Sequence, residues 1–327
     1  MDWSAQDIRT ALNELQQLSP KDGQAYKDAQ QSADVLLKSY WQFYGLDYDV
    51  LGLAKPSAWL INVESQQICV QQFTARNERG RILVLHGYYD HVGLYKHLIR
   101  ECLELGLSVT TFDLPGHGLS SGDRASIDSF QSYQVVLDAI IKDQNIQHGS
   151  RWSIIGQSTG GAVILDYLSR NQFTHEDCPF SNVILLAPLV RPTGWFTGRI
   201  MLRLVRPFKD SIARGFAQSS HDKAFLRFIR HEDPLQHDRL EVSWVSAMDE
   251  WIGDVESRAS SDLLVHVIQG TDDNTVDWQH NLPQIKKLFK TVSINTIKDA
   301  RHHLVAESLE FRSQVFSFVR RILGASD

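Results

Sequence analysis

Short, continuously apolar segments alternate with longer amphipathic segments along most of the chain, from about Trp59 onward. A short apolar run bounded by turn residues is typical of a strand buried on both faces, and apolar residues three and four apart predict helices. The expected strands cover residues 59–75 (a hairpin), 81–85, 107–114, 152–155, 183–186, 263–269 and 292–297. The expected helices cover residues 94–105, 130–143, 160–170, 282–289 and 311–323. Strands alternating with helices predict an α/β fold with a mostly parallel sheet covered on both faces.

Two segments depart from this alternation. Residues 1–45 carry apolar residues at helical spacing, and we expect an N-terminal helical extension that packs against the main domain. Residues 191–254 separate two expected core strands and are too long for a simple connection and too apolar for a linker. We expect them to form a helical cap over the carboxyl ends of the strands, inserted between core segments 46–190 and 255–327.

One expected helix of this cap, residues 195–208, has two chemically different faces. Its apolar face carries Phe196, Ile200, Met201, Leu204 and Val205, and its basic face carries Arg199, Arg203 and Arg206. We expect the apolar face to be buried over a cavity with the arginines in water. The alternative is transient contact with a membrane surface.

Composition narrows the class of protein further. The 327 residues, 43% apolar and 22% charged, suit one large soluble domain, or a domain with an inserted subdomain. No apolar run is long enough to cross a bilayer, and three widely spaced cysteines suit a reducing compartment, so we expect a cytoplasmic protein. The net charge of −6 argues against a nucleic-acid partner, and the cysteines form no zinc-binding pattern.

The stretch Gly156-Gln157-Ser158-Thr159-Gly160 carries the first candidate chemistry. It follows an expected strand and begins an expected helix, which is the setting of a G-x-S-x-G nucleophile elbow. The tight turn leaves no room for side chains at Gly156 and Gly160, and it exposes the Ser158 hydroxyl at a helix N-terminus. We therefore expect Ser158 to be a nucleophile.

A serine hydroxyl needs a base, and the base needs an orienting carboxylate. The loop after the expected strand 263–269 contains Asp272 and Asp273, and the loop after strand 292–297 contains His302 and His303. The order Ser, Asp, His agrees with this arrangement of strands. Spacing alone does not choose between the two aspartates or between the two histidines.

These motifs together resemble the α/β-hydrolase superfamily, in the branch of monoacylglycerol lipases, lysophospholipases and serine aminopeptidase-like hydrolases. The matching segments are Leu-His-Gly-Tyr at 85–88, Asp-Leu-Pro-Gly-His-Gly at 113–118, the elbow, Asp-Pro-Leu at 233–235, Gly-Thr-Asp-Asp at 270–273 and Ala-Arg-His-His-Leu at 300–304. The resemblance implies that Asp273 is the acid and His302 the base. It also implies an oxyanion hole formed by the backbone N–H groups of Tyr88 and Thr159.

The chain departs from this branch at three positions. Gln157 and Thr159 flank the serine where the branch usually has His and Met, and His303 stands where a glutamate is common. The resemblance implies a serine hydrolase that cleaves carboxylic esters, such as monoacylglycerols or lysophospholipids, without a cofactor or metal. The alternatives are a peptidase or amidase of the same branch, or a non-catalytic hydrolase-like protein that binds a small ligand.

Overall fold

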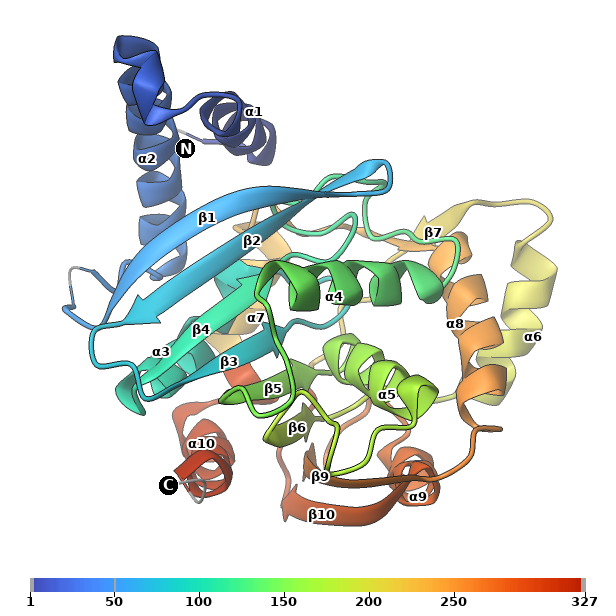
Figure 1. Ribbon diagram of the computed structural model, residues 1–327. Helices are drawn as coiled ribbons and strands as arrows, with labels where there is room; N and C mark the ends of the chain where they lie inside the picture. The colour runs from blue at the N-terminus through green and yellow to red at the C-terminus, as the bar shows by residue number, and fades with distance from the viewer. Residues whose placement is uncertain (1–2, 50, 325–327) are drawn as a thin grey trace.

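The computed structural model describes residues 3–49 and 51–324, and an eight-stranded sheet lies at its centre (Figure 1). The strand order is β1-β2-β4-β3-β5-β6-β9-β10. The strands span Ala54–Val63 (β1), Gln66–Ala75 (β2), Gly80–Leu85 (β3), Leu107–Phe112 (β4), Trp152–Gln157 (β5), Asn182–Leu186 (β6), Ser261–Gly270 (β9) and Phe289–Ile297 (β10). From β4 to β10 every neighbouring pair is parallel, whereas β1 and β2 form an antiparallel hairpin, and β2 runs antiparallel to β4.

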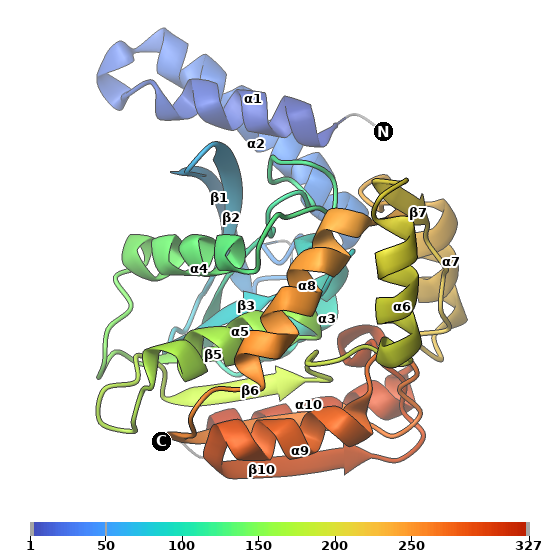
Figure 2. The ribbon, with the colours of Figure 1, turned by 90° about the vertical axis from the view of Figure 1, so that its right-hand side faces the viewer.

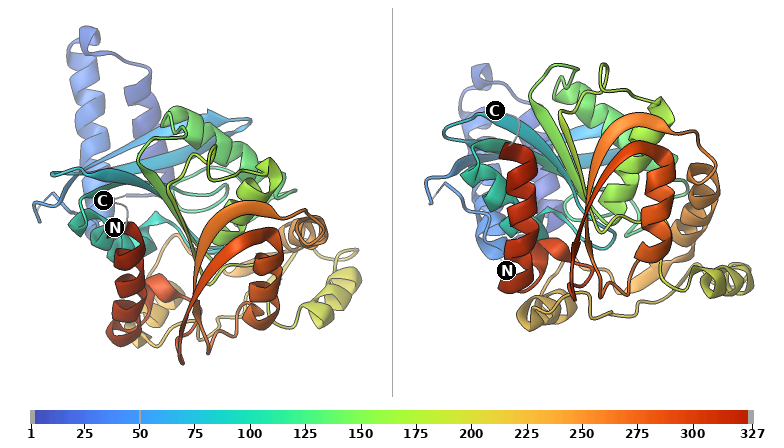
Figure 3. Two further views of the ribbon diagram at one scale, coloured as in Figure 1. Left: turned by 60° about the horizontal axis from the view of Figure 1, so that its bottom comes forward. Right: turned by 90° about the horizontal axis from the view of Figure 1, so that it is seen from below.

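Helices cover both faces of the sheet, as the uninterrupted apolar strands predict. Alternate residues of one strand enter different cores, because successive side chains of a strand point to opposite faces. On β3, Ile82 packs in the core that includes residues of α3 (Lys96–Glu104) and α10 (Leu309–Gly324). The neighbouring Leu83 packs in the core with α4 (Gln131–Asp143), α5 (Thr159–Asn171) and α9 (Trp278–Leu288). Figure 3 shows α10, in red, and α9, in orange-red, on opposite sides of the sheet.

Two helices precede the sheet, α1 (Ala5–Gln16) and α2 (Gln24–Tyr44), joined by a short 3₁₀ turn. The side chain of Gln16 hydrogen-bonds the backbone of Leu60 on β1. On α2, the indole N–H of Trp41 donates to the buried Gln71 on β2, at 2.9 Å. The N-terminal helices are therefore packed on the antiparallel end of the sheet, as Figure 1 also shows.

The segment between β6 and β9, where a helical cap is expected, is not entirely helical. It contains α6 (Trp195–Val205), α7 (Lys223–His231) and α8 (Val242–Val255), together with two short strands, β7 (Ser211–Ala213) and β8 (Arg239–Glu241). The two strands pair antiparallel. The sequence pattern did not predict them, because each has only three residues. Figure 2 shows α6 and α8 side by side in this segment. Among residues 3–49 and 51–324, no helix has the length and apolar character needed to span a membrane.

Candidate active site

Ser158 lies at the turn between β5 and α5, with a φ of 54°. A positive φ is costly for a residue with a side chain, so the surrounding turn must impose it. Glycines make this turn possible: a Cβ on Gly156 would lie 2.5 Å from the backbone of Gly160, and one on Gly160 would lie 2.4 Å from the Leu85 carbonyl oxygen. The turn therefore holds the Ser158 side chain beyond the carboxyl end of β5, beside the end of β3.

A hydrogen-bonded chain connects Ser158 to two residues from distant loops. The Nε2 atom of His302, from the loop after β10, lies 2.9 Å from Ser158 Oγ. The Nδ1 atom of His302 lies 2.8 Å from Oδ2 of Asp273, which follows β9. The parallel strands end at the same edge of the sheet, so their loops meet there. This geometry lets Nδ1–H donate to the carboxylate and leaves Nε2 free to accept the serine proton.

The carboxylate of Asp273 is fully hydrogen-bonded. Its Oδ1 accepts from the backbone N–H groups of Thr275 and Val276, at 2.9 and 3.1 Å. Its Oδ2 accepts from Gln269 Nε2 at 3.0 Å in addition to His302. Burial opposes ionisation, but the charge of His302 and these hydrogen bonds outweigh it and hold the pKa of Asp273 below its usual value.

The same pair shifts the pKa of His302 in the opposite direction. Burial disfavours the imidazolium, but the charge and hydrogen bond of Asp273 outweigh burial and raise the pKa of His302. The pair is therefore poised to accept a proton from Ser158.

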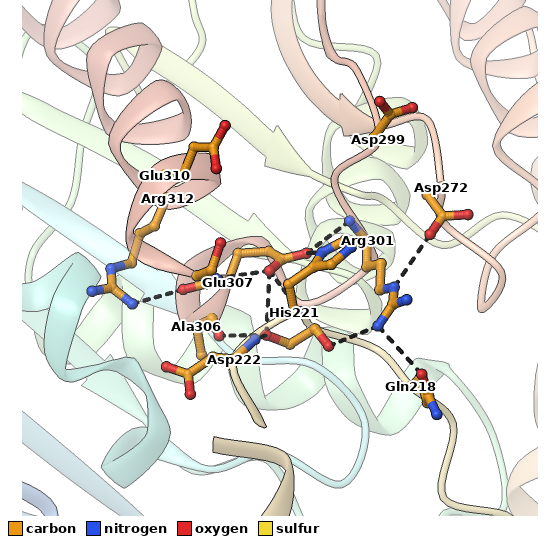
Figure 4. A network of polar contacts seen from close by, with 12 residues as sticks. Gln218, His221, Asp222, Asp272, Asp299, Arg301, Ala306, Glu307, Glu310 and Arg312 are labelled. Carbon is orange, nitrogen blue, oxygen red and sulfur yellow. Dashed lines mark hydrogen bonds and ion pairs between the residues drawn. The ribbon is translucent and has the colours of Figure 1, made fainter. Parts of the chain in front are cut away.

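Asp272 is directed away from this chain of contacts. Its Oδ2 lies 3.2 Å from Nε of Arg301, and Figure 4 shows Arg301 reaching toward it. The loop that carries His302 is anchored separately by the buried Glu307, which accepts hydrogen bonds from the backbone N–H groups of Arg301 and His221. The structure thus places Asp273, and not Asp272, against His302.

His303 points to a different acid. Its Nε2 lies 3.0 Å from Oδ1 of Asp90, and the other oxygen of Asp90 accepts from the hydroxyl of Tyr95 at 2.9 Å. The hydroxyl of Tyr95 in turn accepts from the backbone N–H of Gly87 at 3.0 Å. These contacts connect the His302 loop to residues 86–91, which contain the expected oxyanion donor Tyr88 and which we call the oxyanion loop. The sequence analysis did not predict the Asp90–His303 pair. The one signal that could have indicated it was the presence of His303 at a position where glutamate is common.

The oxyanion loop lies directly against the candidate nucleophile. A Cβ added to Gly87 would lie 3.2 Å from Cβ of Ser158. Within the described residues, the backbone N–H groups of Tyr88 and Thr159 have no hydrogen-bond acceptor, so both are available to a ligand. The Tyr88 ring stacks on Trp244 of α8, with centroids 3.7 Å apart, and this contact fixes the loop beneath the cap.

His86 and Asp113 have structural partners. The Nδ1 atom of His86 lies 2.8 Å from the Gly87 carbonyl oxygen, and its Nε2 accepts from the Leu114 N–H. Burial lowers the pKa of His86, which suits a neutral ring in these contacts. Asp113 accepts from the backbone N–H groups of Val92 and Leu119. Within residues 3–49 and 51–324, no three His, Cys, Asp or Glu side chains form a group that could hold a metal ion.

A cavity of about 420 Å³ opens beside Ser158 and His302, beneath the cap. Its apolar lining includes Leu202 and Val205 of α6 and Trp244, Val245 and Met248 of α8. Its polar lining includes Asp90, Arg214, Ser219 and His303. The candidate nucleophile therefore lies at a mainly apolar cavity that also carries several polar groups.

The expected burial of the apolar face of α6 is wrong for most of that face, although Met201 and Val205 line the cavity. Phe196 is 80% exposed, Leu204 is 62% exposed, and Ile200 and Met201 are also exposed. The helix is held instead by Trp195 and Leu202, which are buried. Helical spacing identified the two faces but not the neighbours of each. On the other face, Arg199 forms an ion pair with Asp249 of α8.

Comparison with known proteins relates this arrangement to hydrolases. A family model described as serine aminopeptidase, S33, matches residues 76–308. Human monoglyceride lipase is 30% identical over 135 residues, which are 40% of this chain and 42% of that protein. An uncharacterised abhydrolase domain-containing protein of Dictyostelium discoideum is 25% identical over 203 residues, 59% of this chain and 20% of that protein. The alignments thus span less than half the length of these two relatives.

Longer alignments are more distant in sequence. A monoglyceride lipase homologue of Monkeypox virus is 22% identical over 246 residues, 72% of this chain and 86% of that protein. The crystal structure of a soluble variant of monoglyceride lipase from Saccharomyces cerevisiae, in complex with a substrate analogue, matches with a TM-score of 0.69. That match covers 83% of this chain and 96% of the yeast chain at 19% identity, and it confirms the expected fold.

Proposed function

Since the chain belongs to the serine aminopeptidase S33 family of α/β-hydrolases, we propose that it cleaves carboxylic esters through an acyl-enzyme on Ser158. The observation that supports this most strongly is the continuous chain from Ser158 Oγ to His302 and on to Asp273, at 2.9 and 2.8 Å. A serine at a strained turn, a base within hydrogen-bond reach and a buried carboxylate behind the base are the parts that acyl transfer requires.

In the proposed reaction, Ser158 Oγ attacks the carbonyl carbon of the ester while Nε2 of His302 takes the serine proton. Asp273 holds the imidazole in the tautomer with hydrogen on Nδ1 and stabilises the imidazolium that forms. The backbone N–H groups of Tyr88 and Thr159 donate to the carbonyl oxygen as it becomes an oxyanion. The tetrahedral intermediate expels the alcohol, which receives the proton from His302.

Deacylation repeats these steps with water as the nucleophile. His302 takes a proton from the water, which attacks the acyl carbon, and the second tetrahedral intermediate releases the acid and returns the proton to Ser158.

The proposed substrates are amphiphilic esters with one acyl chain, of the monoacylglycerol or lysophospholipid type. An apolar lining from α6 and α8 suits an alkyl chain, since each methylene removed from water contributes about 0.8 kcal/mol. Monoglyceride lipases among the relatives agree with this choice. A peptidase or amidase activity is the second candidate, because the matching family is described as serine aminopeptidase. A non-catalytic ligand binder would not need the hydrogen-bonded arrangement of Ser158, His302 and Asp273, so this arrangement favours an enzyme.

We also propose that the cap makes transient contact with a membrane surface through α6. The exposed Phe196, Leu204 and Phe208 would enter the interface, and the exposed Arg203 and Arg206 would face anionic headgroups. Such contact would bring the cavity beneath α6 close to lipids.

The proposed function is tested with a fluorophosphonate probe and a short p-nitrophenyl ester. The expected result is covalent labelling at Ser158, and a loss of 10³- to 10⁶-fold in kcat, as an order of magnitude, for Ser158→Ala. A matched control is Ser65→Ala, at an exposed serine in the β1–β2 turn, which should keep full labelling and activity. A Ser158→Ala protein that retains more than about a tenth of the activity would contradict the assignment.

A further inference from the structure

A half-buried arginine of the cap lines the candidate active-site cavity without an acidic partner. Arg214 follows β7, and it lines the same cavity as Ser158 and His302. No carboxylate of the described residues lies within 4.0 Å of its guanidinium, in contrast to Arg199, Arg258 and other arginines of this chain. Burial lowers the pKa of Arg214, because the charged form has lost much of its contact with water.

The guanidinium of Arg214 is held in a fixed orientation by neutral groups. Its carbon lies 3.7 Å from the ring centroid of Tyr89 and 4.6 Å from that of Phe216. One nitrogen, Nη1, donates to the side-chain oxygen of Gln236 and to the carbonyl oxygen of His237, at 2.8 and 3.0 Å. Its Nε and Nη2 have no acceptor among the described residues. A rigid guanidinium with unused donors is suited to bind a planar or tetrahedral oxyanion.

The nearby carboxylates are committed to other partners. Asp90 lines the same cavity, but its two oxygens are taken by His303 and Tyr95. Asp233, which packs close by, accepts from Tyr44 and from the imidazole of His91. Partly burying the Arg214 cation without a charged partner costs free energy, because the guanidinium loses hydration. Residual solvent and more distant charges offset only part of that free energy.

The lining of the cavity is mainly apolar, and Arg214 is a charged group within it. Much of the apolar lining comes from α6 and α8, whereas Arg214 comes from the connection after β7, which also contributes Phe216, and it stacks on Tyr89 of the oxyanion loop. An ester with its acyl chain in the apolar part and its carbonyl at Ser158 has only its alcohol portion left to contact Arg214. We propose that Arg214 binds an anionic group on the alcohol portion of the substrate, so that the preferred substrates are single-chain esters of phosphate- or carboxylate-bearing alcohols.

This inference rests on the proposed function, and it extends that function by selecting a substrate class. The test compares 1-octanoylglycerol 3-phosphate, the octanoyl ester of glyceric acid and neutral 1-octanoylglycerol, all below their micelle concentrations. The three share an acyl chain, so the ratio of their kcat/KM values reports recognition of the alcohol. The first two compounds distinguish phosphate from carboxylate as the bound anion.

Wild-type protein should prefer at least one anionic ester over the neutral one by about 10- to 100-fold, the range of a charge-assisted hydrogen bond. Arg214→Gln should remove most of this preference, and Arg214→Lys should retain part of it through its charge. The matched control is Arg230→Gln, since Arg230 is exposed and approaches Phe216 only from 5.7 Å, outside the cavity lining. Arg230→Gln should leave the ratio unchanged.

Two results would overturn the inference: no preference in the wild type, or an unchanged ratio in Arg214→Gln. An unchanged ratio with equal loss on all three esters would assign Arg214 a purely structural role. Binding to the Ser158→Ala protein separates this inference from the proposed function, because it needs no hydrolysis. Non-hydrolysable octyl ether analogues are titrated while tryptophan fluorescence is followed, to which Trp195 and Trp244 of the cavity lining contribute. If esters are not hydrolysed but the anionic ether binds more tightly through Arg214, only the proposed chemistry fails.

Discussion

Asp273→Asn should nearly abolish ester hydrolysis while leaving the fold intact. An asparagine oxygen in the Oδ1 position keeps the hydrogen bonds from Thr275 and Val276. The amide N–H₂ then takes the position of Oδ2 and faces His302 Nδ1, which must give up its proton to accept a hydrogen bond. The remaining proton of His302 moves to Nε2 and points at Ser158 Oγ, so the base is in the wrong tautomer.

The size of the effect follows from this geometry. The corresponding substitution in a serine protease lowers kcat about 10⁴-fold for the same reason, which is roughly 5 kcal/mol of transition-state free energy. Asp272→Asn is the matched control, since it changes the adjacent residue in the same way. The side chain of Asp272 is 45% exposed, pairs with Arg301 and accepts a long hydrogen bond from Asn274, so the substitution should cost about 1 kcal/mol of stability or less and change kcat within about twofold.

The assay measures kcat on p-nitrophenyl butyrate, the thermal midpoint of each variant, and kcat/KM of each variant against pH. Activity requires neutral His302 and is therefore lost as the pH falls through the His302 pKa, which Asp273 raises above the usual 6.5. The wild-type midpoint should lie above that value, and residual activity of Asp273→Asn should have its midpoint at lower pH, because the charge that raises the pKa is gone. Equal losses in both variants, or an unmoved midpoint, would refute the assignment of Asp273.

Four further substitutions test other parts of the molecule. Asp90→Asn should lower kcat about 10-fold with little change in KM, because it loosens the oxyanion loop. Removing an oxyanion donor altogether lowers kcat by about 10²- to 10³-fold, so a loosened loop should cost less. A change in KM alone would contradict this reasoning. Tyr44→Phe removes a 2.6 Å hydrogen bond to Asp233 and should cost about 1.5–3 kcal/mol in urea unfolding at pH 7. The pKa of Asp233 is lowered to about 2, so its carboxylate stays charged until the pH falls toward that value. The loss of unfolding free energy in Tyr44→Phe should therefore shrink only at such low pH, where the carboxyl is protonated. A loss that does not change with pH would show that the charge plays no part. Leu202→Ala should flatten the rise of kcat/KM with acyl length, because Leu202 lines the cavity. Leu204→Ala should leave activity on soluble esters unchanged and weaken only activity on anionic vesicles, because Leu204 is exposed. The reverse pattern would indicate that Leu204 is buried against the cavity, as first expected for α6.

Much of the fold could be predicted from the sequence because its signals are local. An apolar run such as Trp152–Gln157 is buried on both faces, so its pattern already identifies a central parallel strand. The elbow is equally local, since the need for Gly156 and Gly160 arises from atoms within the turn and at the adjoining end of β3. Because parallel strands end at one edge, the order of the loops also predicted which segments would meet Ser158.

The rest depends on contacts between distant segments, which local spacing does not report. Asp272 and Asp273 are neighbours of the same type. Contacts such as that with Arg301 on one side and those with Gln269 and His302 on the other direct them differently. The partnership of His303 with Asp90 joins residues 213 positions apart. The exposed face of α6 was misjudged for a related reason: amphipathic spacing identifies an apolar face but cannot name what covers it.

The two apolar surfaces of α6 imply a division of roles along one helix. Leu202 and Val205 line the cavity, whereas Leu204 between them in sequence points outward and is exposed. A helix that served only to close the cavity would gain nothing from the exposed leucine, since water is a poor environment for it. If α6 rests on a lipid surface, the same helix can contact the membrane on one side and the extracted acyl chain on the other. The cavity is then loaded from the surface, and Arg214 adds the anionic headgroup to the features by which the proposed enzyme selects among the lipids it meets.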